Sequence, residues 1–443
     1  MKPVTNIWHP CTQMKDHEKY PLVKIDRGEG IYLIDEHGNK LIDAVSSWWV
    51  NLFGHNTPRL KNAIKDQLDK LEHCIFAGLT HDPALKLTES LLEVTPANLT
   101  KVFYADIGSA AVESAMKLSY GYRKNNGITA KKRFMYLDHG YHGETLGALS
   151  VCGEQLYTEL YGDIMMDNIR VQGPDCYRCP YGKTRNDCSA ECFEHMERAM
   201  EKHAHETTAV MIEPLLQCAG GMKMFPPIYL KKLCQCAKAH DIHTIFDEIA
   251  SGFGRTGTMF ALEQAGVEPD FVCVSKGITS GYLPLAAVLT TDEIYMAFYD
   301  DYTSLKAFLH SHSFTGNPLA CAVANETMKI FKENNVIETN KEKFRVMHEY
   351  LNKKFEGKPH VGEVRHLGCV SAVQLVKDVK TKEGFDWKER TGFQIFRNAV
   401  QKGAYLRNLG DVIYFMTPYI INEDEIVKLV DIAHDSVYEV LSN

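Results

Sequence analysis

The sequence predicts an α/β fold, in which a mostly parallel central sheet carries helices on both faces and a smaller α+β domain follows it. Short apolar segments bounded by polar or Gly-containing turns alternate with segments of helical spacing in the middle of the chain. The polar motifs follow the carboxyl ends of the expected strands, where open α/β sheets bind ligands. After about residue 325 the composition becomes more charged, which indicates the smaller domain.

The expected strands of the central sheet are short and apolar. They are Lys101–Asp106, Arg133–Asp138, Ala209–Pro214, His243–Asp247, Phe271–Ser275 and Ala286–Thr290. Apolar residues recur with helical spacing between most of them, as at Ala111–Tyr122 and Pro227–Ala239. This alternation is typical of parallel strands that are joined by helices.

The two ends of the chain are expected to pack together. Ile31–Asp35 and Lys40–Asp43 flank a Gly-Asn turn and predict a hairpin, and a final helix is expected from Glu423. We therefore expect three parts. An N-terminal segment, residues 1–60, packs with a small C-terminal domain, residues 326–443, and residues 61–325 form the large domain that carries most of the polar motifs.

The composition is that of a large soluble protein. The 443 residues are 45% hydrophobic, which suffices for a substantial core. A net charge of −8 and a pI near 6.2 argue against nucleic acid as a ligand, because nucleic acid selects for a basic face. No apolar run approaches the ~18 residues of a membrane span, and the first residues lack the apolar core of an export signal. We expect a cytoplasmic protein.

Thirteen cysteines in such a chain predict reduced thiols rather than disulfides. Four of them form Cys176-x2-Cys179 and Cys188-x3-Cys192, a spacing that would suit zinc or an iron–sulfur cluster. The two pairs lie close together without a separate small domain around them, so reduced loop thiols are the alternative. We assign the cluster no metal and no part in catalysis.

An acid and an amine end two expected strands that lie close in the sheet. Asp247 ends one strand, Lys276 follows the next, and Gly252-Phe-Gly-Arg-Thr-Gly257 lies between them. The pair suits pyridoxal 5′-phosphate (PLP), because a Lys forms an imine with the cofactor aldehyde and an Asp keeps the pyridine nitrogen protonated. A helix cap and a solvated lysine are the alternative.

Glu213, at the end of another strand, is expected to pair with Arg255, either across the site or as a surface ion pair.

Two further turns follow expected strands. Gly108 and Ser109 open a helix, where free N–H groups and the helix dipole would bind a phosphate, although a Ser near a helix start is more often an ordinary helix cap. Tyr141 lies in His139-Gly-Tyr-His-Gly143, where its ring either stacks on a flat cofactor or packs on the core. Both turns gain weight because they precede the Asp–Lys pair in the same sheet.

Together these motifs resemble the class III aminotransferases. They occur in that family's order across essentially the whole chain, as Gly108-Ser-x-x-Val-Glu113, His139-Gly-Tyr-His-Gly143, Asp247-Glu-x-x-x-Gly-Phe-Gly-Arg-Thr-Gly257, Ser275-Lys276-Gly277 and Gly316-Asn-Pro-Leu-Ala320. The resemblance implies a PLP-dependent transferase of fold type I, which is a homodimer with active sites at the subunit interface. Small molecules are then its substrates.

The resemblance also implies a role for each motif. Lys276 would carry the cofactor and then shuttle a proton between the donor's alpha carbon and the cofactor's C4′, Asp247 would stabilise the protonated ring, and Tyr141 would stack on it or line the channel. The residues expected at the cofactor are Gly108, Ser109, Tyr141, Asp247, Lys276, His312 and, at the phosphate, Ser313 of the partner subunit. Because the cofactor would hold the amino group between two half-reactions, the resemblance also implies ping-pong kinetics.

Three further features resemble the members of the family that aminate 8-amino-7-oxononanoate in biotin biosynthesis. They are Trp8-His-Pro10, Ser46-Ser-Trp-Trp49 and Arg407-x-Leu-Gly-Asp-Val-Ile-Tyr414. That substrate is a long apolar chain with a carboxylate, which an aromatic wall and a guanidinium would suit. A core Trp pair and a surface Arg are the alternative. The residues expected at the substrates are Cys11, Trp48, Trp49, Tyr141, Ser311, Arg407 and Tyr414.

Different residues favour different amino donors. Tyr414 favours S-adenosylmethionine, whereas Cys11 stands where members that use this donor would carry a Tyr, and a thiol does not stack on an adenine. The stretch His310-Ser-His-Ser-Phe-Thr-Gly316 resembles relatives that use lysine. We expect S-adenosylmethionine, with lysine as the alternative. A class III transaminase of another terminal amine, using pyruvate or 2-oxoglutarate, and a non-enzymatic binding protein are the other interpretations.

Overall fold

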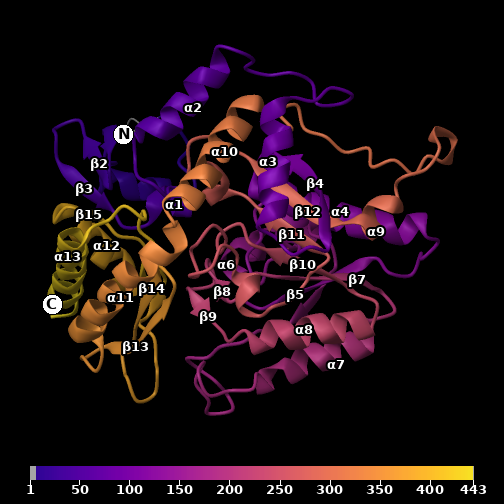
Figure 1. Cartoon of the computed structure of the whole chain (residues 1–443). Helices are drawn as coiled ribbons and strands as arrows, with labels where there is room; N and C mark the ends of the chain where they lie inside the picture. The colour runs from indigo at the N-terminus through magenta and orange to yellow at the C-terminus, as the bar shows by residue number, and fades with distance from the viewer. Residues whose placement is uncertain (1–5, 443) are drawn as a thin grey trace.

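A seven-stranded sheet forms the centre of the molecule (Figure 1). The structure is a computed structural model, and it describes residues 6–442. The sequence analysis expects no export signal at the start of the chain, and residues 1–5 of that segment lie outside the described residues. In sheet order the strands are β4 (Leu99–Ala105), β12 (Ala286–Thr291), β11 (Phe271–Val274), β10 (His243–Asp247), β7 (Thr207–Ile212), β5 (Arg133–Leu137) and β6 (Ile169–Val171).

The prediction of a mostly parallel sheet is confirmed. The strands from β11 to β6 run parallel to one another, and only β12 and its contacts with β11 and β4 are antiparallel. All the expected strands are present. The sequence does not predict β6, because a strand of three residues is too short to show a period.

Each face of the sheet has its own apolar core. Successive residues of a strand point to opposite faces, so Phe271 of β11 belongs to the core under α4 (Gly108–Asn125), whereas Val272 belongs to the core that includes α8 (Ile228–Ala239). Helix α7 (Glu194–His203) lies beside α8 (Figure 1). Helices therefore cover both faces, which explains why the strand sequences are apolar throughout.

The N-terminal hairpin and the C-terminal third of the chain share a sheet. Strands β1 (Ile25–Glu29), β2 (Tyr32–Asp35) and β3 (Lys40–Asp43) are antiparallel neighbours, and β3 pairs in parallel with β15 (Ala404–Tyr405). A second C-terminal sheet contains β13 (Val361–Leu367), β14 (Val370–Leu375), β17 (Val412–Phe415) and β16 (Asn408–Leu409). The division into residues 1–60, 61–325 and 326–443 stays a prediction, and α10 (Pro318–Glu333) runs through its second boundary.

The other elements connect or cover these sheets. They are α1 (Ser46–Trp49), α2 (Pro58–Leu68), α3 (Asp82–Glu93), α5 (Leu146–Leu149), α6 (Gln155–Thr158), β8 (Leu216–Gln217), β9 (Lys223–Met224), α9 (Asp292–Met296), α11 (Val336–Phe355), α12 (Thr391–Gln401) and α13 (Glu423–Leu441). Short 3-10 turns occur between them, including one at Lys276–Thr279. Within residues 6–442, no helix is both long and apolar enough to cross a membrane.

Candidate active site

A cavity of about 1730 Å³ lies between the central domain, the N-terminal turn after β3 and the C-terminal sheet. Seven of the predicted site residues line it, namely Cys11, Trp48, Trp49, Tyr141, Lys276, Arg407 and Tyr414. Gly108, Ser109 and Asp247 are not among its lining residues, and neither are Ser311, His312 and Ser313. One chain therefore brings together all the expected substrate residues except Ser311.

Lys276 lies two residues after the end of β11 and has a left-handed backbone, with φ of 45°. This conformation costs a non-glycine residue roughly 1–2 kcal/mol and is typical of functional sites. The Lys276 Nζ lies 4.5 Å from the centroid of the Trp49 ring. Burial lowers the pKa of the amine, although the charges of Asp247 and Glu213 act in the opposite direction. A lowered pKa brings the amine closer to the neutral form that a nucleophile needs.

Asp247 is buried at the end of β10, as the sequence predicts. Its Oδ2 lies 2.7 Å from Nδ1 of His142, and its Oδ1 accepts a hydrogen bond of 3.0 Å from the backbone N–H of Ile249. A buried carboxylate requires such partners, and they fix the direction of the Asp247 side chain. Sequence analysis misses His142, although its place beside Tyr141 in a Gly-rich turn is a usable signal.

The expected pair of Glu213 and Arg255 is wrong. Glu213 accepts hydrogen bonds from the backbone N–H groups of Tyr141 (2.9 Å) and Cys218 (3.0 Å), and burial raises its pKa to about 7. Arg255 instead donates to three backbone carbonyls, including that of Trp49 at 3.3 Å. Both charged groups are buried, and the hydrogen bonds that each one makes are to backbone groups rather than to the other side chain.

The start of α4 has the features of an anion site. Its N-cap residue, Ile107, gives no side-chain hydrogen bond to the first turn, so backbone N–H groups around Gly108 and Ser109 remain available as donors. The turn that carries Tyr141 approaches this point closely. A Cβ on Gly143 would lie 2.4 Å from the Cβ of Ser109, so only glycine fits there.

Trp48 and Trp49 lie on a tight turn that we call the tryptophan turn, Ser46–Trp49. All four of its residues have positive φ, between 47° and 73°. The Arg407 guanidinium carbon lies 4.8 Å from the centroid of the Trp48 ring, and Trp49 Nε1 donates a 3.2 Å hydrogen bond to the hydroxyl of Tyr414. The aromatic wall and the cation expected for an apolar carboxylate are therefore in contact. Arg407 forms no ion pair with a residue that the structure describes.

A carboxylate faces the same cavity. Glu144 Oε1 accepts a 2.9 Å hydrogen bond from the Tyr141 hydroxyl and lies 3.9 Å from the Cys11 sulfur. The Tyr141 ring also packs on the ring of Tyr157, with 5.2 Å between centroids. Burial, together with Glu144, raises the pKa of Tyr141, so this hydroxyl stays protonated. Sequence analysis gives no role to Glu144 or Tyr157, since neither has a distinctive pattern around it.

Ser313, which is expected to act from a partner subunit, lies on an outward loop together with Ser311 and His312. Ser311 and Ser313 are exposed, and His312 lies 3.7 Å from Asp106 at the end of β4. The loop follows α9 and projects away from the body of the molecule before α10 (Figure 1). Its neighbour Leu309 is 91% exposed. Such apolar exposure is typical of a surface that another chain covers.

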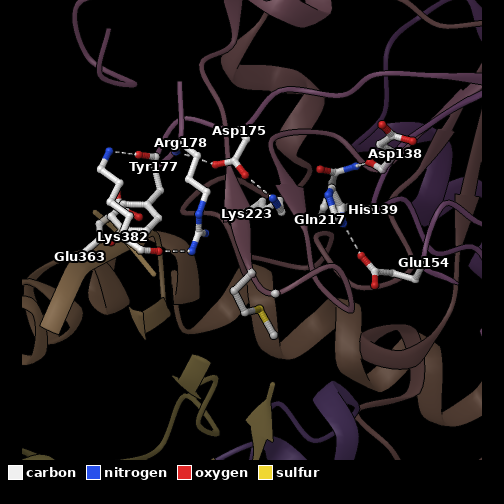
Figure 2. Close-up of polar contacts among 12 residues, drawn as sticks. Asp138, His139, Glu154, Asp175, Tyr177, Arg178, Gln217, Lys223, Glu363 and Lys382 are labelled. Atoms are coloured by element: carbon white, nitrogen blue, oxygen red, sulfur yellow. Dashed lines mark hydrogen bonds and ion pairs between the residues drawn. The ribbon is translucent and has the colours of Figure 1, made fainter. Parts of the chain in front are cut away.

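The four clustered cysteines lie on a loop that spans residues 174–192 and that we call the cysteine loop. All four line a second cavity of about 240 Å³. No group of three or more His, Cys, Asp or Glu residues within 6–442 is arranged to hold a metal ion. The loop is tied to its surroundings by polar contacts (Figure 2), in which Arg178 donates to the Lys382 carbonyl at 2.9 Å, and Lys223 pairs with Asp175.

Comparisons with known proteins agree with this geometry. The family model described as "Aminotransferase class-III" matches residues 13–437. The chain belongs to the class III aminotransferases. Members of this family use PLP, and Lys276, Asp247 and the start of α4 stand at the motifs by which the sequence resembles them.

Several relatives within the class III aminotransferases carry one name. The chain is 43% identical over 436 residues to the adenosylmethionine-8-amino-7-oxononanoate aminotransferase of Geobacter sulfurreducens, which covers 98% of this chain and 96% of that protein. The enzyme of the same name from Aquifex aeolicus is 44% identical over 425 residues, covering 96% of this chain and 93% of that protein.

Solved structures of class III aminotransferases share the whole fold. The adenosylmethionine-8-amino-7-oxononanoate aminotransferase of Methanocaldococcus jannaschii superposes with a TM-score of 0.92 at 39% identity, covering 98% of this chain and 97% of that one. The omega transaminase of Pseudomonas jessenii, solved in complex with PMP, gives a TM-score of 0.94 at 30% identity, covering 100% and 98%. The expected fold type is therefore confirmed.

Proposed function

We propose that this aminotransferase converts 8-amino-7-oxononanoate to 7,8-diaminononanoate in biotin biosynthesis, with PLP as cofactor and S-adenosylmethionine as amino donor. The observation that carries the proposal is the contact between the tryptophan turn and Arg407, in the cavity that Lys276 lines. The relatives from Geobacter sulfurreducens and Aquifex aeolicus, which cover 98% and 96% of this chain, are named for the same reaction.

The residues around Lys276 fit PLP. The N–H groups at the start of α4 suit its phosphate, the buried Asp247 suits its protonated pyridine nitrogen, and the Lys276 amine suits its aldehyde. When bound, PLP supplies an electron-withdrawing ring that stabilises negative charge beside the substrate nitrogen. With PLP bound, Lys276 Nζ would take a proton from the donor's alpha carbon and deliver it to the cofactor's C4′ in the same half-reaction, and it would carry a proton in the reverse direction in the acceptor's half-reaction.

The acceptor pocket follows from the tryptophan turn. Trp48 and Trp49 offer apolar surface to the five methylene groups between the ketone and the carboxylate of the keto acid, and Arg407 offers two parallel N–H donors to that carboxylate. Because Arg407 has no carboxylate partner among the described residues, its charge is available to the substrate. An amine without a terminal carboxylate would leave this guanidinium unpaired, which argues against a general amine transaminase.

The donor proposal rests on charge. S-adenosylmethionine carries a sulfonium, and the Glu144 carboxylate, held by the Tyr141 hydroxyl, lines the same cavity. Lysine also carries a remote cation, so the carboxylate suits both donors. Cys11 lies beside Glu144 and gives no aromatic surface to an adenine, which keeps lysine as the second candidate.

We also propose a cytoplasmic homodimer. The outward loop after α9 carries Tyr302, Leu305, Leu309 and Phe314, which are between 61% and 92% exposed. A second copy of the chain would cover these side chains and bring Ser313 of the partner subunit to the phosphate site. The large apolar exposure of this loop is what supports the homodimer.

One assay tests the reaction. The holoenzyme is incubated with 8-amino-7-oxononanoate and, in separate arms, S-adenosylmethionine, lysine, pyruvate plus an amine, or 2-oxoglutarate plus an amine, and 7,8-diaminononanoate is measured by mass spectrometry. We expect product with S-adenosylmethionine. Product only with lysine would replace the donor and keep the acceptor. Turnover of 2-oxoglutarate with no product from 8-amino-7-oxononanoate would refute the proposed function.

A further inference from the structure

The tryptophan turn has a backbone that its own residues do not favour. Ser46, Ser47, Trp48 and Trp49 are consecutive, none is glycine, and all have left-handed φ values of 51°, 47°, 73° and 72°. In a left-handed conformation the Cβ of any residue other than glycine crowds the backbone. Several consecutive left-handed residues therefore persist only where the surrounding structure imposes that conformation. Something outside the turn must therefore hold it.

The strongest external contacts come from Asp43. This carboxylate is fully buried at the end of β3. Its Oδ1 accepts a 2.8 Å hydrogen bond from the backbone N–H of Ser47, and its Oδ2 accepts one of 2.7 Å from the Ser47 hydroxyl. Nε2 of His55 lies 3.0 Å from the same Oδ2, and Nδ1 of His55 lies 3.2 Å from the amide nitrogen of Asn51. Asp43 thus bonds the second residue of the turn by both backbone and side chain.

The position of Asp43 also relates the turn to Arg407. Asp43 is paired in parallel with Tyr405 of β15, two residues before Arg407. The chain leaves β3 toward the tryptophans and leaves β15 toward the arginine from the same edge of the sheet. Trp48 and Arg407 then meet at 4.8 Å. A change at Asp43 would move one half of this contact relative to the other.

The rest of the turn faces the reacting groups. The Trp49 ring lies under Lys276 Nζ at 4.5 Å and bonds the Tyr414 hydroxyl. The Ser46 hydroxyl donates a 2.7 Å hydrogen bond to the backbone carbonyl of Met416, which anchors the start of the turn. Asp43 and His55 themselves are not among the residues that line the cavity. Any effect they have on substrate must pass through the turn.

We propose that Asp43, supported by His55, is a positioning residue that determines acceptor binding: it holds the left-handed tryptophan turn so that Trp48 stays stacked with Arg407. The acceptor half of this inference rests on the proposed function. The conformational half does not, since it concerns the fixed direction of two tryptophan side chains.

The kinetic test uses Asp43→Asn, which keeps the size of the side chain but replaces one carboxylate oxygen, the acceptor Oδ2 that the Ser47 hydroxyl and His55 share, by an NH2 donor. Hydrogen bonds to a charged group contribute about 1.5–3 kcal/mol, which is roughly a tenfold to hundredfold effect, so we expect KM for 8-amino-7-oxononanoate to rise at least about tenfold. We expect kcat, per site titrated by the PLP absorbance, to change less than about threefold, because Lys276 is not moved.

Asp35→Asn is the matched control. Asp35 accepts similar hydrogen bonds in the hairpin, from the N–H groups of His37 and Asn39, away from the cavity.

Ser47→Ala is the second variant, because Ser47 is exposed and its loss does not endanger folding. It removes one of the bonds to Asp43, and we expect a smaller rise in KM in the same direction. Unchanged KM values in both variants, or a fall in kcat with KM unchanged, would overturn the proposal.

Fluorescence separates this inference from the proposed function. The chain has four tryptophans, and the other two, Trp8 and Trp387, are 87% and 80% exposed. In a Trp8→Phe/Trp387→Phe background only the tryptophan turn emits. We expect Asp43→Asn to shift this emission to longer wavelength and Asp35→Asn to leave it unchanged, whether or not the enzyme accepts 8-amino-7-oxononanoate. An emission spectrum that Asp43→Asn does not alter would refute the positioning role even if the proposed reaction is confirmed.

Discussion

Replacing Glu213 with Gln would remove a buried ionisable group close to Lys276 while keeping its size. Burial raises the pKa of this carboxyl from 4.5 to about 7. At 1.36 kcal/mol per pH unit, this corresponds to roughly 3 kcal/mol of preference for the protonated form in the folded protein. The folded state therefore binds the proton more tightly than the unfolded chain. The stability contributed by this proton is complete below about pH 4.5 and is lost as the pH rises through 7.

The assay is urea unfolding of the wild type and of Glu213→Gln at equal protein and PLP concentrations. Linkage gives about 2 kcal/mol for the part of this effect between about pH 5.5 and pH 8.5. We expect the wild type to lose that much stability relative to the variant over this interval. Other groups titrate in both proteins, so the difference between the two is what counts. Parallel pH dependences would refute the burial argument for Glu213.

A second measurement follows the pH profile of PLP imine formation at Lys276, with Glu248→Gln as the matched control for Glu213→Gln. Burial also raises the pKa of Glu248 to about 7, but Glu248 is not among the charges that act on Lys276, whereas Glu213 is. Removing the Glu213 charge should lower the pKa of the Lys276 amine further. The pH profile of PLP imine formation by the apo-enzyme should therefore move to lower pH in Glu213→Gln and stay in place in Glu248→Gln. Equal profiles in all three proteins would show that Glu213 does not influence the lysine.

Three further substitutions test the proposed roles. Lys276→Ala should keep PLP only non-covalently and lose turnover, so borohydride reduction followed by peptide mapping should find no label; activity near that of the wild type would remove the central assignment. Asp247→Asn should leave the far-ultraviolet circular dichroism unchanged but lower kcat by several orders of magnitude, because the pyridine nitrogen loses its counter-charge; a rate within tenfold of wild type would contradict this. Arg407→Ala should weaken binding of the keto acid by ~2–4 kcal/mol of lost charge pairing, measured as a higher KM, whereas an unchanged KM would place the carboxylate elsewhere.

The sequence predicts the central sheet well because its strands are apolar on both faces and bounded by turns. His243–Asp247 is found with the predicted bounds, and the final helix begins at Glu423 as expected. The helix α12 (Thr391–Gln401) escapes sequence analysis, since it interrupts a run of short strands in the C-terminal third. Local periodicity is reliable only where one kind of element continues for long enough to repeat.

Sequence analysis finds the residues that react more readily than the residues that hold them. Lys276 and Asp247 stand at strand ends beside glycines, which is a local pattern. His142 and Glu144 flank Gly143 in a turn after a strand, but the partners that would reveal their roles are distant in sequence: Asp247 is 105 residues from His142, and Cys11 is 133 residues from Glu144. The expected pairing of Glu213 with Arg255 failed for a different reason, because both side chains form hydrogen bonds with backbone groups, which residue types do not reveal.

The order of the motifs along the chain determined the family, the cofactor chemistry that we propose and the side chains that carry it, since strand ends and glycine turns are written in local sequence. Only the tertiary structure decided that Trp48 lies against Arg407, that Trp49 lies under Lys276 and that Asp43 holds the turn between them. These contacts join segments more than 200 residues apart or depend on a left-handed backbone that the residues themselves do not favour. They exist because burial in the assembled fold outweighs the local preference of the chain.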